Sequence, residues 1–298
     1  MLETDGLYRY ESQLPPNLSD QDLVLIHLFD GYIDAGGVNR GLRDYVLEQC
    51  EHERYVSFDI DQIHDYRSRR PMFIFDTNHL DSMIDFALVI YQVTDQAGKR
   101  FLLLTGPEPD HQWHRVSKAV FEICEVAGVK TLVTASGMPI AVPHTRPTLI
   151  TQHSTDPQTI SGNPMWIEKI QLPGSFSHFM EYQAGVLGLL ASGYVAHVPH
   201  YLMQTRFPQA IAEVLAKINE FGELAIPVEK ILERAVENLN TISEETNSDS
   251  DFPVLVQTLE EQYDRLQESG AASLPSAEEI GAVVERFLAE QEPPDYSR

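Results

Sequence analysis

The chain has 298 residues, 43% of them hydrophobic, which is enough for one large domain with an appendage or for two domains. Its 45 acidic and 21 basic side chains give a net charge of −24, so nucleic acid and anionic membranes are not expected partners. The acidity is uneven, since residues 213–298 hold 20 acids and 6 bases, a net charge of −14. The C-terminal third is therefore a separate compositional zone.

The N-terminus has neither the basic nor the apolar segment of a secretory signal, and no apolar run approaches the ~20 residues of a membrane span. We therefore expect a cytoplasmic protein. The two cysteines, Cys50 and Cys124, lie in helical patterns and form no Cys-x-x-Cys motif. Buried reduced thiols are the favoured interpretation, and a disulfide is the alternative.

An apolar run over residues 23–29 is typical of a strand buried on both faces, as in a parallel sheet. Asp30-Gly31 ends this run, and a helical pattern follows over 34–50. Further strands are expected at 55–60, 86–93, 100–105, 130–135, 148–151, 166–172 and 194–198, and further helices at 113–126 and 176–190. This alternation predicts an α/β core domain over residues 1–205, with a mostly parallel sheet flanked by helices.

Residues 148–173 hold two short strand patterns around a polar turn, which predicts a projecting β-hairpin insertion. From residue 206 the apolar spacing is only helical, and residues 206–298 are expected to form a C-terminal helical region with acidic outer faces. Four amphipathic helices are expected there, over 211–221, 228–239, 255–266 and 280–288.

The common signatures of nucleotide-binding loops, dinucleotide-binding folds, zinc proteases and serine hydrolases are absent from the sequence. His111 and His114 are three residues apart but have no third ligand beside them, so they do not predict a metal site. The sequence therefore predicts no cofactor and no metal, and it names no reaction.

Polar loops follow several of the predicted strands, and ligands of open α/β folds bind where parallel strands end. The candidate ligand-binding residues in these loops are Asp30, Gly31, Asp34, Gly106, Glu108, Met138, His144, Arg146 and His197. Asp34, Glu108 and His144 are the candidate catalytic residues, because they can transfer protons, and Arg146 could anchor an anion.

Each candidate also has a structural interpretation. Asp34 could cap the helix that follows it. His144 and Arg146, in a loop stiffened by prolines, could bond backbone carbonyls or a neighbouring subunit, and His197 could belong to a structural junction. A basic segment with Arg67, Arg69 and Arg70 could hold an anion or an acidic helix, and the acidic C-terminal helices are the more economical partner.

Several of these segments occur in an order that resembles the actinobacterial branch of the proteasome assembly chaperone family, a branch also described as ATP-grasp-like. The resemblance covers roughly residues 20–270. It is carried by the segments 30–36, 69–71, 106–113, 143–147, 173–175, 193–201 and 259–264.

This resemblance implies a core like that of purine nucleoside phosphorylases and peptidyl-tRNA hydrolases. It also implies a C-terminal helical lid over the ligand pocket and a β-hairpin insertion used in homo-oligomers, with trimers favoured. Eukaryotic relatives are dimeric chaperones of proteasome α-ring assembly, without catalytic residues.

Two functions from different classes follow. The favoured one is a non-catalytic binding or assembly protein with a protein partner and a ligand pocket at the strand ends. The alternative is a phosphorylase/hydrolase-like enzyme or a small-molecule sensor that acts on an anionic or nucleoside-like ligand.

Overall fold

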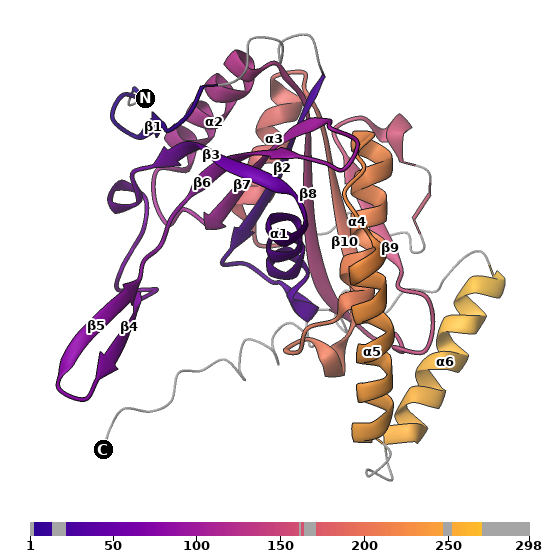
Figure 1. Ribbon diagram of the computed structural model, residues 1–298. Helices are drawn as coiled ribbons and strands as arrows, with labels where there is room; N and C mark the ends of the chain where they lie inside the picture. The colour runs from indigo at the N-terminus through magenta and orange to yellow at the C-terminus, as the bar shows by residue number, and fades with distance from the viewer. Residues whose placement is uncertain (1–2, 14–21, 161, 164–170, 247–251, 270–298) are drawn as a thin grey trace.

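The computed structural model describes residues 3–13, 22–160, 162–163, 171–246 and 252–269 (Figure 1). The strands of the main sheet are β1 (Tyr8–Tyr10), β2 (Leu23–Asp30), β3 (Glu51–Phe58), β6 (Val89–Thr94), β7 (Arg100–Pro107), β8 (Val129–Ile140), β9 (Ile150–Ser154) and β10 (Leu190–Pro199). A separate hairpin is formed by β4 (Met72–Asp76) and β5 (His79–Ile84). The α-helices are α1 (Val38–Gln49), α2 (Trp113–Ala127), α3 (Phe176–Val186), α4 (Pro208–Gly222), α5 (Glu229–Thr246) and α6 (Phe252–Ser269).

The main sheet has the strand order β1-β3-β6-β7-β2-β8-β10-β9. Four consecutive strands, β7, β2, β8 and β10, are parallel, whereas the pairings that involve β1, β3, β6 and β9 are antiparallel. The expectation of a mostly parallel sheet is therefore wrong, and the sheet is mixed. One cause is the tight turn between β6 and β7, where the Asp95 carboxylate accepts hydrogen bonds from the N–H groups of Ala97 (2.9 Å) and Lys99 (2.8 Å).

Helices cover both faces of the sheet. The side chains of β2 alternate, so that Val24, Ile26 and Leu28 pack with α1 and α4 on one face, while Leu25 and Phe29 pack with α2 and α3 on the other. A strand with both faces buried explains the continuous apolar run that predicts it. The C-terminal helical region begins with α4, whose apolar side shares the core of the first face with α1 and β10.

The β4–β5 hairpin is the two-stranded element that projects from this core, and Figure 1 shows it extending away from the sheet. The sequence predicts a hairpin insertion at 148–173 instead. In that range, β9 pairs with β10 and forms an edge of the main sheet. Most of the strand expected at 166–172 lies outside the described residues, as does the helix expected at 280–288. Within the described residues, no helix is both long and apolar enough to cross a membrane.

Candidate functional site

The ends of the four parallel strands carry four of the predicted site residues. Asp30 ends β2, while Gly106, Met138 and His197 lie near the carboxyl ends of β7, β8 and β10. These strands are neighbours in the sheet, so their ends form one edge, which we call the carboxyl edge. The fold therefore places these residues where α/β proteins bind ligands, and their binding of a ligand remains a prediction.

The loops after β2 and β7 are joined by their backbones and by Arg69. The N–H of Glu108 donates to the carbonyl of Asp30 (2.7 Å). The Arg69 guanidinium donates to the carbonyls of Asp30 (3.0 Å) and Glu108, and it pairs with the Asp110 carboxylate (2.8 Å). Arg69 of the basic segment thus holds two loops of its own core, whereas Glu260 and Asp264 of the acidic C-terminal helix α6 pair with Arg146.

Two glycines make this close approach possible. Gly31 has a φ of +146°, and a Cβ there would lie 3.0 Å from both Arg69 Nη1 and Glu108 Cβ. Gly106 has a φ of +144°, and its Cβ would lie only 2.2 Å from the backbone oxygen of Ala87. Both positions therefore require glycine for conformation and for space, which explains them without a ligand.

Glu108 contacts the N-terminus of α3. Its Oε1 accepts a hydrogen bond from the N–H of Phe176, the first residue of the helix. Burial raises the pKa of Glu108, and this hydrogen bond opposes the rise. The N-terminus of a helix attracts anions, because its N–H groups are unpaired and its dipole is positive there. The chain's own carboxylate thus occupies a position that a ligand anion could use.

Asp34 has the same relation to α1. Its carboxylate accepts hydrogen bonds from the N–H groups of Asn39 (2.7 Å) and Arg40 (3.2 Å) in the first turn of the helix. Burial raises the pKa of Asp34, and these two bonds oppose the rise. Asp30, its neighbour, pairs with Arg43 (2.5 Å). The capping interpretation of Asp34 therefore agrees with its contacts.

His144 contacts the hydroxyl of Tyr201, through its backbone N–H (3.0 Å) and its Nδ1 (2.9 Å). Burial lowers the pKa of His144 and raises the pKa of Tyr201 to about 12. A neutral imidazole beside a protonated phenol is thus expected at pH 7.

Arg146 is bound by α6. Its guanidinium donates to both carboxylate oxygens of Asp264 (2.9 and 2.7 Å) and to Glu260 (3.1 Å). The Tyr263 hydroxyl adds a bond to the carbonyl of Pro147 (3.0 Å). The hydrogen bonds that Arg146 donates to Asp264 raise the pKa of Arg146 and lower the pKa of Asp264. The predicted anion anchor therefore has two carboxylates of its own chain as partners, rather than backbone carbonyls.

His197 is buried on the side of the sheet covered by α3. Its Nε2 lies 2.8 Å from the Thr151 hydroxyl on the adjacent strand β9, and burial lowers the pKa of His197 to about 4. Met138, directly opposite His197 in the register of β8 and β10, is partly buried. These contacts fit the structural interpretation of His197.

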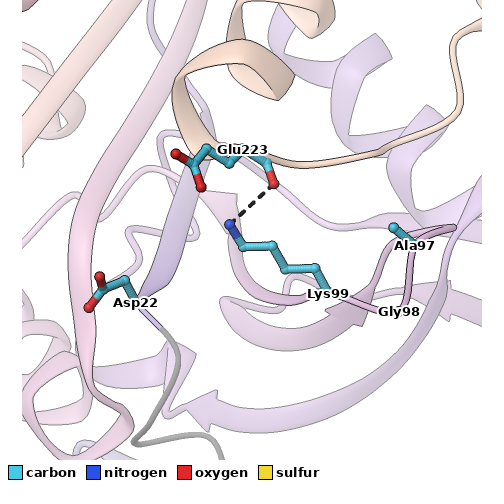
Figure 2. A pocket seen from close by; sticks show the side chains of 5 residues that line it. All are labelled: Asp22, Ala97, Gly98, Lys99 and Glu223. Atoms are coloured by element: carbon cyan, nitrogen blue, oxygen red, sulfur yellow. Dashed lines mark hydrogen bonds between the residues drawn. The ribbon is translucent and has the colours of Figure 1, made fainter.

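A hollow of about 480 Å³ lies near the turn between β6 and β7, at the opposite end of the parallel strands, and contains none of the predicted site residues. It is lined by Asp22, Ala97, Gly98, Lys99 and Glu223 (Figure 2). The Lys99 ammonium donates to the carbonyls of Gly222 (2.9 Å) and Glu223 (3.1 Å) at the end of α4. A cation in contact with the last carbonyls stabilises the C-terminus of a helix, so Lys99 has a structural role there. Across the described part of the chain, no group of three or more His, Cys, Asp and Glu side chains could hold a metal ion.

The β4–β5 hairpin is the feature that sequence reasoning missed. All of its residues are exposed, including seven large apolar side chains: Met72, Phe73, Ile74, Phe75, Leu80, Met83 and Ile84, each 45–68% exposed. The signal was available, since the apolar run 72–75 is followed by a polar turn and by a second segment with apolar residues at 80, 83 and 84.

The comparisons with known proteins agree with this architecture. A protein of unknown function from Mycobacterium tuberculosis is 36% identical, with a TM-score of 0.86 over 97% of this chain and 98% of its own. Another protein of unknown function, from Corynebacterium glutamicum, is 32% identical, with a TM-score of 0.84 over 89% of this chain and 99% of its own. No curated protein matches.

A more distant structure has the same fold. It is described as a proteasome-assembly chaperone homologue from Mycobacterium tuberculosis, and it is 19% identical, with a TM-score of 0.71 over 78% of this chain and all of its own. The sequence itself matches the PAC2 family over residues 28–246, which include strands β3 to β10 and helices α1 to α5. The chain therefore belongs to the PAC2 family.

Proposed function

We propose that this protein is a non-catalytic assembly protein that acts through protein-binding surfaces and forms a homo-oligomer, with a trimer favoured. The observation that carries the proposal is the exposed β4–β5 hairpin. An isolated two-stranded hairpin is marginally stable in water, and monomeric soluble proteins rarely expose large contiguous apolar patches. The hairpin therefore needs a surface to pack against.

Both faces of the hairpin are apolar. Met72 and Ile84 are directly paired, and Phe73 is paired with Met83 on the opposite face. A strand pair that lay flat on its own sheet would need only one apolar face. Two apolar faces suit an arm that is enclosed by another molecule.

The contacts at the carboxyl edge support a non-catalytic function. The groups that could bind an anion or transfer a proton are already used within the chain: Glu108 at α3, Asp34 at α1 and Arg146 at α6. A ligand would have to displace these contacts. The relative described as a proteasome-assembly chaperone homologue makes proteasome subunits the first protein partner to test.

The experiment is a measurement of molar mass in solution by light scattering. We expect the wild-type protein to be an oligomer and Phe73→Ser/Phe75→Ser to dissociate to monomers with unchanged circular dichroism. Tyr182→Ser/Val186→Ser on α3 is the matched control, because it also removes two large exposed apolar side chains. A monomeric wild type, or a hairpin variant with the mass of the wild type, would contradict the proposal.

A second candidate is a sensor that binds a small anion at the carboxyl edge. It is favoured by one observation, the presence of two carboxylates with raised pKa at the N-termini of α1 and α3. An anionic or nucleoside-like ligand that displaced Glu108 would raise the melting temperature, by the equivalent of about 2.7 kcal/mol at 100 times its Kd. A thermal-shift screen with phosphate, nucleosides and nucleotides tests it, and a shift that persists in Glu108→Ala/Arg146→Ala would place the ligand elsewhere.

A further inference from the structure

We propose that the β4–β5 hairpin of one copy docks on helix α5 of the next copy, where Arg67 and Arg70 pair with Glu233 and Glu237. The inference rests on the proposed function, because it takes the homo-oligomer as given and names the two surfaces that meet.

The hairpin surface combines apolar side chains with positive charge. Arg67 and Arg70 are exposed and lie just before the start of β4. Neither guanidinium forms an ion pair with any residue in the described ranges. In a chain with a net charge of −24, two unpaired arginines at the base of an apolar arm indicate that the receiving surface is acidic as well as apolar.

Helix α5 presents such a surface. Its buried stripe, which includes Ile231 and Ala235, packs against the core, while Leu232 and Val236 lie one turn apart and are 51% and 60% exposed. Glu233 and Glu237 immediately follow these two residues in the helix and are also exposed. Among the described side chains, neither glutamate has an ion-pair partner within 4 Å.

Charge distinguishes α5 from the other exposed apolar helices. On α3, Tyr182 and Val186 are exposed, but the acid of that helix, Glu181, is paired with His153 (2.7 Å). On α6, Glu260 and Asp264 are both bound to Arg146. On α6, Glu261 is exposed and is the one further described carboxylate without an ion pair. Helices α3 and α6 therefore offer at most one such carboxylate, whereas α5 has two, Glu233 and Glu237, beside its exposed apolar pair.

The contact is between copies and it is heterologous. The hairpin and α5 lie on different sides of the molecule in Figure 1, and the hairpin of the single chain is exposed throughout. Since two different surfaces meet, each copy has one donor arm and one receiving helix. Such contacts close into a ring when the rotation between copies allows it.

Charge reversal tests the pairing. Arg67→Glu/Arg70→Glu and Glu233→Arg/Glu237→Arg should each raise the dissociation constant of the oligomer by about tenfold or more in sedimentation experiments, because like charges then meet. The quadruple variant should recover most of the wild-type affinity. Lys130→Glu and Glu213→Lys, which are exposed and without ion pairs among the described residues, are the matched controls and should change little. Absence of recovery in the quadruple variant would overturn the pairing.

A mixing experiment tests the surfaces themselves. Phe73→Ser/Phe75→Ser disrupts the apolar surface of the β4–β5 hairpin, and Leu232→Ser/Val236→Ser disrupts the receiving surface of α5. Each variant should therefore be monomeric alone. Mixed in equal amounts, they should form a heterodimer, since one intact arm meets one intact helix. If the α5 variant keeps the wild-type mass while the hairpin variant dissociates, the inference fails and the proposed function stands. If the wild type itself is a monomer, both fail.

Discussion

At the carboxyl edge of the sheet, Glu108, Asp34 and Arg146 each form hydrogen bonds with groups of the same chain, whereas the apolar side chains of the β4–β5 hairpin face solvent. The first region resembles a binding site in its residue types, but its groups are bound internally. The second was not predicted as a site, but its large apolar side chains are exposed to solvent. A binding surface is therefore identified better by the interactions that its groups still lack than by the residue types that it contains.

The largest expected effect concerns the packing of the carboxyl edge. Gly106→Ala should lower the free energy of unfolding by about 3 kcal/mol or more, because the new Cβ would meet backbone atoms of Ala87 and Leu88 at a φ that disfavours alanine. Gly98→Ala is the control, since Gly98 also has a positive φ (+82°) but has no atom within 4 Å of the added Cβ. It should cost only about 1 kcal/mol. If urea unfolding showed the same loss of free energy of unfolding for both variants, close packing would not be the reason that position 106 requires glycine.

The second effect is a loss of stability in mild acid. Burial lowers the pKa of His27 to about 3 and that of His197 to about 4, both below the usual value of a histidine. Neither histidine therefore lowers the free energy of unfolding above pH ~6.5. Below that pH the unfolded chain binds the protons first, so the free energy of unfolding decreases as the pH falls toward the folded pKa. At pH 5 each should cost about 2 kcal/mol relative to pH 7.5.

Urea unfolding at the two pH values measures this loss. His27→Leu/His197→Gln should remove most of the difference between pH 7.5 and pH 5, since neither replacement can be protonated. His79→Gln, at an exposed position of the hairpin, should leave it unchanged. A pH dependence that survives in the double variant would assign it to other groups.

The third effect concerns the attachment of α6. Arg146→Ala removes the ion pairs that Arg146 forms with Asp264 and Glu260 of α6, so amide hydrogens of α6 should exchange roughly two- to fivefold faster. Arg265→Ala is the control, because Arg265 bonds only a carbonyl of its own helix in the described structure. Exchange that is equally fast in both variants would mean that Arg146 does not hold α6.

Local patterns predicted much of the fold. The apolar run of β2 and the end of α2 at Gly128 are properties of short segments, as is the capping interpretation of Asp34. The predicted helices α1 to α4 are confirmed because their apolar spacing faces a core. The shared carboxyl edge also follows from the order of strands and loops.

Long-range contacts could not be predicted in the same way. The direction in which β3 pairs with β6, and the bonds of Arg146 to Asp264 across 118 residues, depend on the packed chain and leave no local signal. The hairpin was missed for a different reason. Apolar strands are expected to be buried, and the segment 72–84 has the pattern of strands without the burial.

The smallest effect is a difference in stability between variants of two neighbouring carboxylates at the carboxyl edge, Glu108 and Asp110. Burial raises the pKa of Glu108, so its ionised form destabilises the fold at neutral pH, and this cost disappears as the pH falls through its folded pKa. Glu108→Gln keeps an oxygen for the N–H of Phe176 and should leave the free energy of unfolding at pH 7.5 unchanged or higher by less than about 1 kcal/mol.

Asp110 is the matched comparison. Burial alone would raise its pKa, but hydrogen bonds from the N–H of Asp65 and from Arg69 lower it, so its charge stabilises the fold at neutral pH and this part is lost in acid. Asp110→Asn should lower the free energy of unfolding at pH 7.5 by about 0.5–1 kcal/mol, a value reduced by solvent screening. Urea unfolding of both variants at pH 7.5 measures the sign of the change in the free energy of unfolding for each. If Glu108→Gln proved as destabilising as Asp110→Asn, the Glu108 charge would be as well compensated as that of Asp110, and a ligand anion would gain little by replacing it.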